Sequence, residues 1–161
     1  MFERLILEIN QAGLSWLTIL KRQDAFRKAF RDFRIDSVAR MSARDVERLM
    51  QDASIIRNRM KIEATVENAR RIRAIRRETG SFADWIAANH PLPKAEWVKL
   101  FKKTFVFTGG EIVGEFLMSI GYLPGAHAVD CPVFKKIAKR DRKSTRLNSS
   151  HIQKSRMPSS A

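Results

Sequence analysis

The sequence predicts an all-α fold, and three observations lead to this prediction. Apolar residues recur three and four positions apart through most of residues 1–140, which is the spacing of one buried helix face. Helix-start signals, in which Ser stands three residues before an acidic residue, precede several of these runs. Strand signals are nearly absent, so we expect about seven to nine helices and essentially no sheet.

The first two predicted helices lie on either side of a short break. The first helix begins at the N-terminus with apolar residues at positions i, i+3, i+4 and i+7, which are Phe2, Leu5, Ile6 and Ile9. Residues 12–15 interrupt this pattern, and Ser15 is a suitable N-cap for a second helix. The apolar residues of the second helix continue to position 30: Trp16, Ile19, Leu20, Phe26 and Phe30.

The middle of the chain is predicted to form a helical hairpin. Ser42 and Asp45 fit the capping signal that starts a helix. A break at residues 52–54 separates this helix from the longest one, which we place over residues 56–78. Gly80 is a suitable stop for the longest helix, whose apolar stripe consists of Ile62, Val66, Ala69 and Ile72.

Four shorter helices are predicted after Gly80. Ser81 and Asp84 repeat the capping signal, and the prolines at 91 and 93 end that helix. Helices over residues 97–103 and 112–120 follow, on either side of a β-branched and aromatic patch at 104–108. A last helix is expected over residues 128–138.

The composition indicates one folded domain with an acidic partner. The chain has 161 residues, of which 44% are hydrophobic, and a formal net charge of +14. The length suits one domain with one core. Nucleic acid is the commonest acidic partner of so basic a chain, although charge alone does not separate a DNA enzyme from other basic proteins.

The folded domain is expected to end near residue 140. Residues 141–161 are rich in Ser and basic residues and have few large apolar side chains, so we expect a disordered tail. The run RKSTRLNSSH (142–151) resembles translated sequencing-adapter sequence, and we interpret the tail as not native. A genuine basic tail that binds nucleic acid is the alternative. Residues 1–140 alone carry +10, from 26 basic and 16 acidic residues.

The only cysteine, Cys131, excludes an intramolecular disulfide and favours an intracellular, cytoplasmic location. No stretch approaches the ~20 apolar residues of a membrane span. The N-terminus also lacks the pattern of a secretory signal. We therefore expect no contact with membranes.

The helical hairpin around residues 52–61 is the first candidate DNA-binding site. Ser54 and Ile55 lie in its predicted turn, and Arg57, Arg59 and Lys61 follow on the next helical turn. Free backbone N–H groups at a helix start bind phosphate, and nearby cations strengthen this binding. An ordinary helix connection with a solvated basic face is the alternative, and the pattern alone favours it over a phosphate site.

The second candidate site combines a carboxylate with a turn and an aromatic ring. Glu8 interrupts an apolar run, and a carboxylate buried there is costly and seldom retained without use. The wet edge of the helix is the alternative location. Trp16 is either a stacking platform or a core residue. Leu14, directly after Gly13, is either a wedge for a base stack or a residue that packs inward.

His127 and Cys131 are the candidate metal ligands. Their i, i+4 spacing places both on one face of a helix, and both residue types bind zinc. A structural zinc site normally has four ligands, so two do not complete one. The alternative is a buried thiol beside a hydrogen-bonded histidine.

Three collinear blocks resemble the signature of the DNA-3-methyladenine glycosylase I family. The first block is LEINQAGLSW at residues 7–16. The second is DVERLMQDASIIRNR at 45–59, followed by KI at 61–62 and NA at 68–69. The third is FLM at 116–118 with Gly121, His127 and Cys131. Together the blocks cover about residues 1–131.

The resemblance implies a helix–hairpin–helix enzyme that hydrolyses the N-glycosidic bond of 3-methyladenine in double-stranded alkylated DNA. The damaged base of such an enzyme is flipped out of the duplex into a pocket. By this resemblance, Glu8 is the catalytic glutamate and Trp16 stacks on the base. Gly13 and Leu14 form the turn that approaches the lesion and fills the gap.

The resemblance also implies a structural zinc ion, because His127 and Cys131 match two of the family's zinc ligands. The other two ligands and part of the base pocket belong to a leading segment of the family that these residues do not match. We therefore expect a truncated chain with half a zinc site and doubtful activity. Ser54 stands where the family usually has a glycine, which weakens phosphate capture.

Two alternatives compete with a monomeric glycosylase. The first is a non-catalytic, basic helix–hairpin–helix module that binds DNA. The second is a basic interaction protein that binds any polyanion in a salt-sensitive manner. The glycosylase interpretation predicts that Glu8 and Trp16 line a concave pocket, whereas Glu8 on a convex solvated surface would favour the first alternative.

Overall fold

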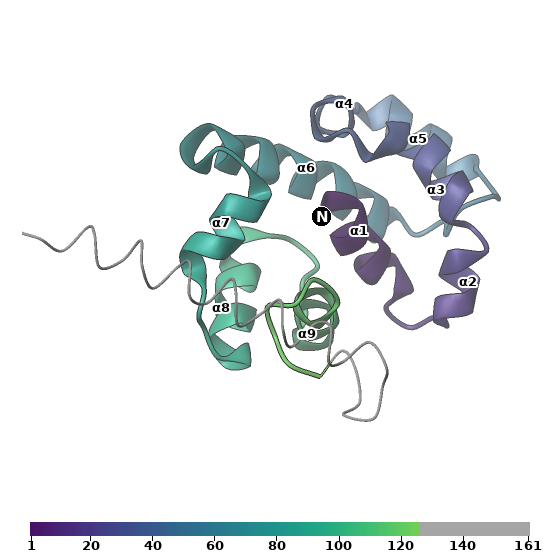
Figure 1. The fold of residues 1–161 in the computed structure, drawn as a ribbon. Coiled ribbons are helices and arrows are strands. Elements are labelled where there is room, and N and C mark those ends of the chain that lie inside the picture. The colour runs from purple at the N-terminus through teal and green to yellow at the C-terminus, as the bar shows by residue number, and fades with distance from the viewer. Residues whose placement is uncertain (126–161) are drawn as a thin grey trace, which may run out of the picture.

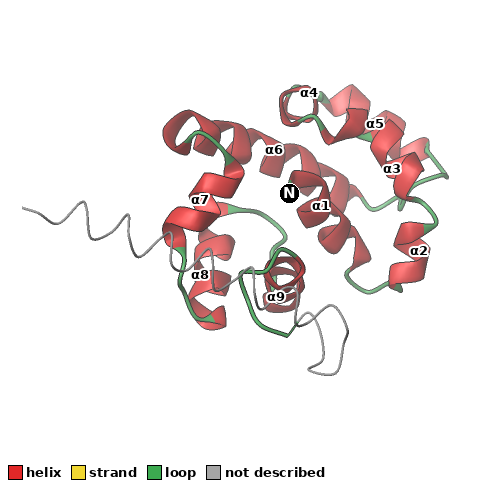
Figure 2. Cartoon of the chain, viewed as in Figure 1, coloured by secondary structure: helices red, strands yellow, loops and turns green. Residues whose placement is uncertain are grey.

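The computed structural model describes residues 1–125, and helices account for most of them (Figure 1). No strand occurs among the described residues, which confirms the predicted all-α class (Figure 2). The helices are α1 (Phe2–Gln11), α2 (Trp16–Leu20), α3 (Gln23–Ala29), α4 (Ile35–Ala39), α5 (Ala43–Gln51), α6 (Arg59–Thr79), α7 (Phe82–Asn89), α8 (Lys94–Thr104) and α9 (Gly110–Ser119). A 3-10 turn, Arg31–Phe33, joins α3 to α4.

Helices α1 and α6 form the middle of the molecule, with α2–α5 on one side and α7–α9 on the other (Figure 1). Helix α6 contacts α1, α4, α5 and α7, while α1 also contacts α2 and α9. One cluster of buried apolar side chains extends through all nine of these helices. Helix α1 is therefore enclosed on several sides, which is why the apolar residues predicted for its buried face lie in the core.

Helix α6 begins later than predicted because Asn58 caps it. The Asn58 side chain accepts a hydrogen bond from the backbone N–H of Lys61 at 3.2 Å, so the helix starts at Arg59 instead of residue 56. Gly80 ends α6 as expected, with a φ of 87° that a residue with a side chain rarely adopts.

Residues 15–30 form two helices, whereas the sequence predicts one. Ser15 caps α2 as expected, because its side chain accepts a hydrogen bond from the N–H of Thr18. The helix then breaks before Arg22, whose guanidinium donates to the carbonyls of Ala53 and Ser54 at 2.9 and 3.0 Å. This contact holds the break between α2 and α3 against the hairpin turn, which the spacing of apolar residues does not reveal.

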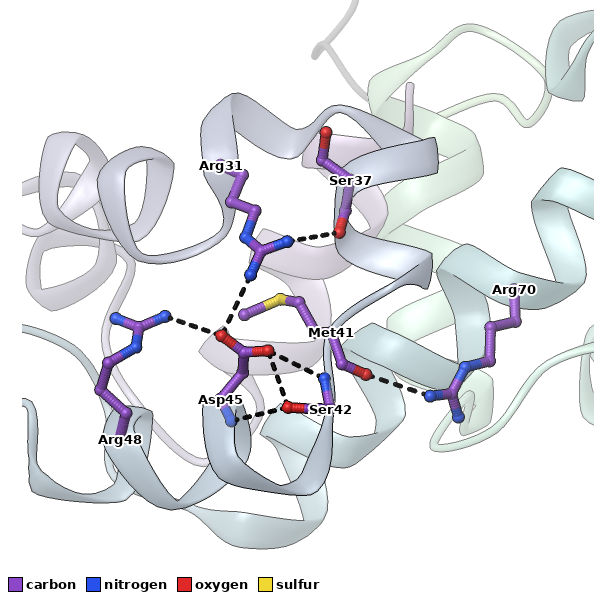
Figure 3. Close-up of polar contacts among 7 residues, drawn as sticks. All are labelled: Arg31, Ser37, Met41, Ser42, Asp45, Arg48 and Arg70. Carbon is purple, nitrogen blue, oxygen red and sulfur yellow. Dashed lines mark hydrogen bonds and ion pairs between the residues drawn. The ribbon is translucent and has the colours of Figure 1, made fainter.

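The predicted capping box at the start of α5 is present (Figure 3). The carboxylate of Asp45 accepts a hydrogen bond from the N–H of Ser42 at 2.9 Å, and Arg31 donates to the same carboxylate at 3.0 Å. Arg70 of α6 donates to the carbonyls of Ala39 and Met41. These contacts fix the start of α5 on α6 and so set the direction from which α5 enters the hairpin.

The β-branched and aromatic patch at residues 104–108 forms the end of α8 and a loop. The amide side chain of Asn68 on α6 donates to the carbonyl of Val106 at 3.0 Å and accepts from its N–H at 2.9 Å. Val106 thus pairs its backbone carbonyl and N–H with one side chain of α6, whereas a residue in a β-sheet would pair them with a neighbouring strand. The helix predicted for residues 128–138 and the domain boundary near residue 140 lie outside the described residues.

Candidate functional site

Glu8 is a buried carboxylate on α1. Its side chain is 1% exposed, and its neighbours along α1, such as Leu7 and Ile9, are buried as well. Glu8 therefore does not lie on the wet edge of the helix or on a convex solvated surface. The expectation that it lines an open pocket with Trp16 is also not met in this conformation, because almost none of its surface is accessible.

Arg4 covers the Glu8 carboxylate and links it to Trp16. One guanidinium nitrogen of Arg4 lies 2.7 Å from a Glu8 oxygen, one helical turn away. The guanidinium carbon lies 4.5 Å from the centroid of the Trp16 ring, which is a cation–π distance. The Arg4 Nε also donates to the Oγ of Ser119 on α9 at 3.0 Å. The acid, the indole ring and α9 are thus joined through one side chain.

Burial disfavours the charged form of Glu8, and the positive charge of Arg4 offsets part of this effect. Burial raises the pKa of Glu8 above its ordinary value, the charge of Arg4 opposes that rise, and the charge of Glu115 on α9 adds to it. Apart from Arg4, no described residue donates a hydrogen bond to either carboxylate oxygen of Glu8. Glu8 is therefore an acid held by one cation and otherwise ready to accept new donors.

The turn after α1 presents Leu14 to solvent. Gly13 has a φ of 82°, which lets the chain reverse directly after α1. Two hydrogen bonds between Gln11 and Leu14 close the turn. The N–H of Leu14 donates to the Gln11 carbonyl, and the Gln11 side chain donates to the Leu14 carbonyl, each at 2.7 Å. Leu14 is 36% exposed, so it does not pack inward. An exposed leucine on a fixed turn is suited to act as a wedge.

Lys61 has a different position from the one predicted for a phosphate ligand. Its side chain is 5% exposed, and its ammonium donates to the carbonyls of Asn10 and Ala12 at 3.0 and 2.6 Å. The ammonium also lies 5.9 Å from the ring centroid of Phe107. The unpaired carbonyls at the end of α1 attract this cation inward. Lys61 therefore joins the start of α6 to the turn that carries Leu14.

The hairpin turn holds its own backbone donors. The carboxylate of Asp52 accepts hydrogen bonds from the N–H and the Oγ of Ser54 at 2.9 and 2.5 Å. These bonds lower the pKa of Asp52. Ile55 is buried, and its N–H points to the Asp52 carbonyl at 3.4 Å. Ser54 and Ile55 thus shape the turn, and their N–H groups are already engaged.

The free donors of the hairpin lie at the start of α6. In the described part of the chain, no acceptor is bonded to the backbone N–H groups of Arg59 and Met60, which begin this 21-residue helix. Arg57 is exposed and makes no ion pair with a described residue. Arg59 instead holds both carboxylate oxygens of Glu47, at 2.7 and 2.8 Å. Among the three predicted cations, Arg57 is therefore the one best placed to receive a phosphate.

The candidate zinc ligands, His127 and Cys131, lie outside the described residues. Within residues 1–125, no group of three or more His, Cys, Asp or Glu side chains is arranged to hold a metal ion. Among the same residues, no helix is long and apolar enough to cross a membrane.

Arg4 and Arg22 are the site residues that sequence reasoning missed. Arg4 stands four residues before Glu8, a spacing that pairs opposite charges on a helix, so its contact with the acid was open to prediction. Arg22 reaches residues 31 and 32 positions away along the chain, and no local pattern indicates such a contact.

Comparison with known proteins shows which family the chain resembles. The family model for methyladenine glycosylase matches residues 1–96. A DNA-3-methyladenine glycosylase of Haemophilus influenzae is 36% identical in an alignment of 151 positions that covers 82% of this chain and 81% of the relative. DNA-3-methyladenine glycosylase 1 of Escherichia coli is 37% identical in an alignment of 150 positions that covers 81% of this chain and 80% of the relative.

A solved structure shows the same fold. The crystal structure of a variant of 3-methyladenine DNA glycosylase I in complex with 3-methyladenine superposes with a TM-score of 0.72 at 35% sequence identity. The match covers 81% of this chain and 80% of that one. The family model and the relatives both cover most of the chain, and the fold agrees with them, so the chain belongs to the methyladenine glycosylase family.

Proposed function

We propose that this chain is a DNA-repair glycosylase that hydrolyses the N-glycosidic bond of 3-methyladenine in double-stranded alkylated DNA. Relatives at 36% and 37% identity carry the name DNA-3-methyladenine glycosylase, and a structural neighbour binds 3-methyladenine. The observation that carries the proposal is the buried Glu8 carboxylate, joined through Arg4 to Trp16 beside the exposed Leu14 turn.

The arrangement is suited to a reaction that needs little acid–base chemistry. Methylation at N3 makes the adenine of the nucleotide cationic, so the base is already a good leaving group. The Glu8 carboxylate holds this cation and then favours the positive charge that develops on the sugar as the C1′–N9 bond breaks. Trp16 offers an aromatic face for the flipped base, and Leu14 fills the space that the base leaves in the duplex.

The backbone of the DNA is held at the hairpin in this proposal. The free N–H groups at the start of α6 and the Arg57 guanidinium bind a phosphate without reading sequence. Lys61 keeps this anchor at a fixed distance from the Leu14 turn, because it spans from α6 to the end of α1. We expect the protein to act as a monomer. A measurement of its molar mass in solution tests this expectation.

Release of 3-methyladenine from methylated duplex DNA, followed by chromatography of the free base, tests the proposed activity. We expect release to be proportional to enzyme and to leave abasic sites. A non-catalytic DNA-binding module would bind the duplex and release no base. A general polyanion binder would bind heparin and unmodified DNA as tightly as methylated DNA.

We also propose that His127 and Cys131 bind structural zinc, because they match two zinc ligands of the family that the sequence resembles. Metal analysis of the purified protein tests this. Because only two of the usual four ligands are matched, we expect weakly held zinc that His127→Ala and Cys131→Ser each remove, and zinc-free wild-type protein would contradict the proposal.

A further inference from the structure

Arg4 makes the contacts that the proposed function reserves for the damaged base. Its planar, cationic guanidinium lies 2.7 Å from the Glu8 carboxylate and 4.5 Å from the centre of the Trp16 ring. A base methylated at N3 is also planar and cationic while it is attached to the sugar. The same acid and the same aromatic face would receive both groups.

The base cannot reach Glu8 unless a covering group moves. The Glu8 side chain is 1% exposed, whereas that of Arg4 is 38% exposed, so Arg4 is the outer member of the pair. Arg4 lies in the first turn of α1, and among residues 1–125 its guanidinium is held only by side chains: those of Glu8, Trp16 and Ser119. Moving the Arg4 side chain therefore breaks no backbone hydrogen bond.

We propose that Arg4 is a binding residue that fills the base site in the free protein and exchanges places with the cationic base during the reaction. The proposal rests on the proposed function. It adds that a cation faces Glu8 before the base enters and again after the base has left. A buried carboxylate without a counter-ion is costly, so each exchange of one cation for another avoids that cost.

The charges of the reaction give the exchange a direction. The nucleotide base carries +1 when it enters, so it replaces Arg4 at no loss of charge beside Glu8. When the C1′–N9 bond breaks, its electron pair stays with the base, which becomes neutral, and the positive charge passes to the sugar. Water then adds at C1′ and loses a proton. The neutral base no longer balances Glu8, and Arg4 returns and displaces it.

The proposal predicts an unusual sign for the loss of Arg4. In the wild-type protein, a neutral ligand must break the Arg4 contacts before it binds, which lowers its apparent affinity. A partly exposed ion pair and a cation–π contact together correspond to roughly a tenfold change in affinity. Free 3-methyladenine should therefore bind about tenfold more tightly to Arg4→Met than to the wild-type protein. Met keeps a helix-forming, unbranched side chain of similar length.

The experiment is calorimetric titration of free 3-methyladenine into wild type, Arg4→Met and Arg27→Met. Arg27 is the matched control, because it is a partly exposed arginine that pairs with Glu3 of α1, away from Glu8. We expect tighter binding only for Arg4→Met, together with stronger inhibition of base release by added 3-methyladenine. Arg4→Lys keeps the charge but not the planar stack, and we expect a smaller tightening, about threefold.

Two results would overturn the proposal in distinguishable ways. If wild type releases 3-methyladenine from DNA but Arg4→Met binds the free base no more tightly, or more weakly, Arg4 is a fixed wall of the site and the exchange is wrong. If wild type releases no base and neither protein binds it, the proposed function fails and the exchange fails with it. If Arg4→Met loses its helical circular dichroism, the affinity of Arg4→Lys for free 3-methyladenine tests the exchange in its place.

Discussion

Glu8 is a buried carboxylate whose cationic partner among the described residues is the partly exposed Arg4. Burying this charge lowers the stability of the folded state. The position of Glu8 within an apolar run leaves both burial and the wet edge of the helix open, and the structure places it in the core. The run does not predict the partner of the carboxylate, although the i, i+4 spacing to Arg4 contains that information. An acid kept in such a place at the expense of stability is typical of a functional site.

Glu8→Gln should stabilise the protein at neutral pH. Because burial raises the pKa of Glu8 in the folded state, its contribution to stability is present below the unfolded pKa and is lost as pH rises through the folded pKa. The neutral amide has no such loss, so we expect a melting temperature higher by roughly 2 °C at pH 7. Thermal unfolding at pH 7 and pH 4 measures the difference, which should shrink at pH 4. The prediction fails if the gain in melting temperature of Glu8→Gln over wild type is smaller at pH 7 than at pH 4.

The hairpin elements show where sequence reasoning reaches its limit. The capping signals at Ser42 and Ser81 correctly mark helix starts, because capping is local. The orientation of Lys61 and the engagement of Arg59 depend on contacts with α1 and α5, which are distant in sequence. A basic residue on an amphipathic helix looks solvated in the sequence whether or not a distant carbonyl binds it.

Lys61→Met should weaken the link between the hairpin and the Leu14 turn. It leaves the carbonyls of Asn10 and Ala12 without their donor in a buried place, which costs about 1–3 kcal/mol. Urea unfolding measures this loss in the free energy of unfolding. Lys99→Met, which removes an exposed lysine paired with Glu96, is the control and should change stability by less than about 0.5 kcal/mol. Equal effects of the two variants would show that the Lys61 contacts contribute nothing.

Arg57→Ala should weaken binding to duplex DNA more than Arg59→Ala does. Arg57 is exposed and makes no ion pair among the described residues, while Arg59 is held by Glu47. Salt-dependent binding to unmodified duplexes of several sequences measures both. We expect Arg57→Ala to reduce the slope of log affinity against log salt by about one, uniformly across sequences. An unchanged slope for Arg57→Ala, or a larger effect of Arg59→Ala, would assign the phosphate contact elsewhere.

At the scale of the whole molecule, α1 connects every part of the proposed machinery. It carries Glu8 and Arg4, ends in the Leu14 turn, and contacts α2, α6 and α9. The all-α class was predictable because periodicity and capping act along the chain. The enclosure of α1 was not, because it results from packing between α2–α5 and α7–α9 (Figure 1). The net charge predicts a nucleic-acid partner, and the proposed phosphate contact would give one of these charges, Arg57 at the hairpin, a specific role.

If the buried carboxylate of Glu8 drives base release, its removal slows single-turnover excision. The rate of 3-methyladenine release from methylated duplex DNA is measured at pH 7 for wild type, Glu8→Gln and Glu3→Gln. The control, Glu3, lies on the same helix and pairs with Gln23 and Arg27. We expect Glu8→Gln to lower the rate about 100-fold, as loss of an electrostatic stabiliser does, with DNA affinity retained and Glu3→Gln close to wild type. A Glu8→Gln protein that releases the base at the wild-type rate would contradict the account.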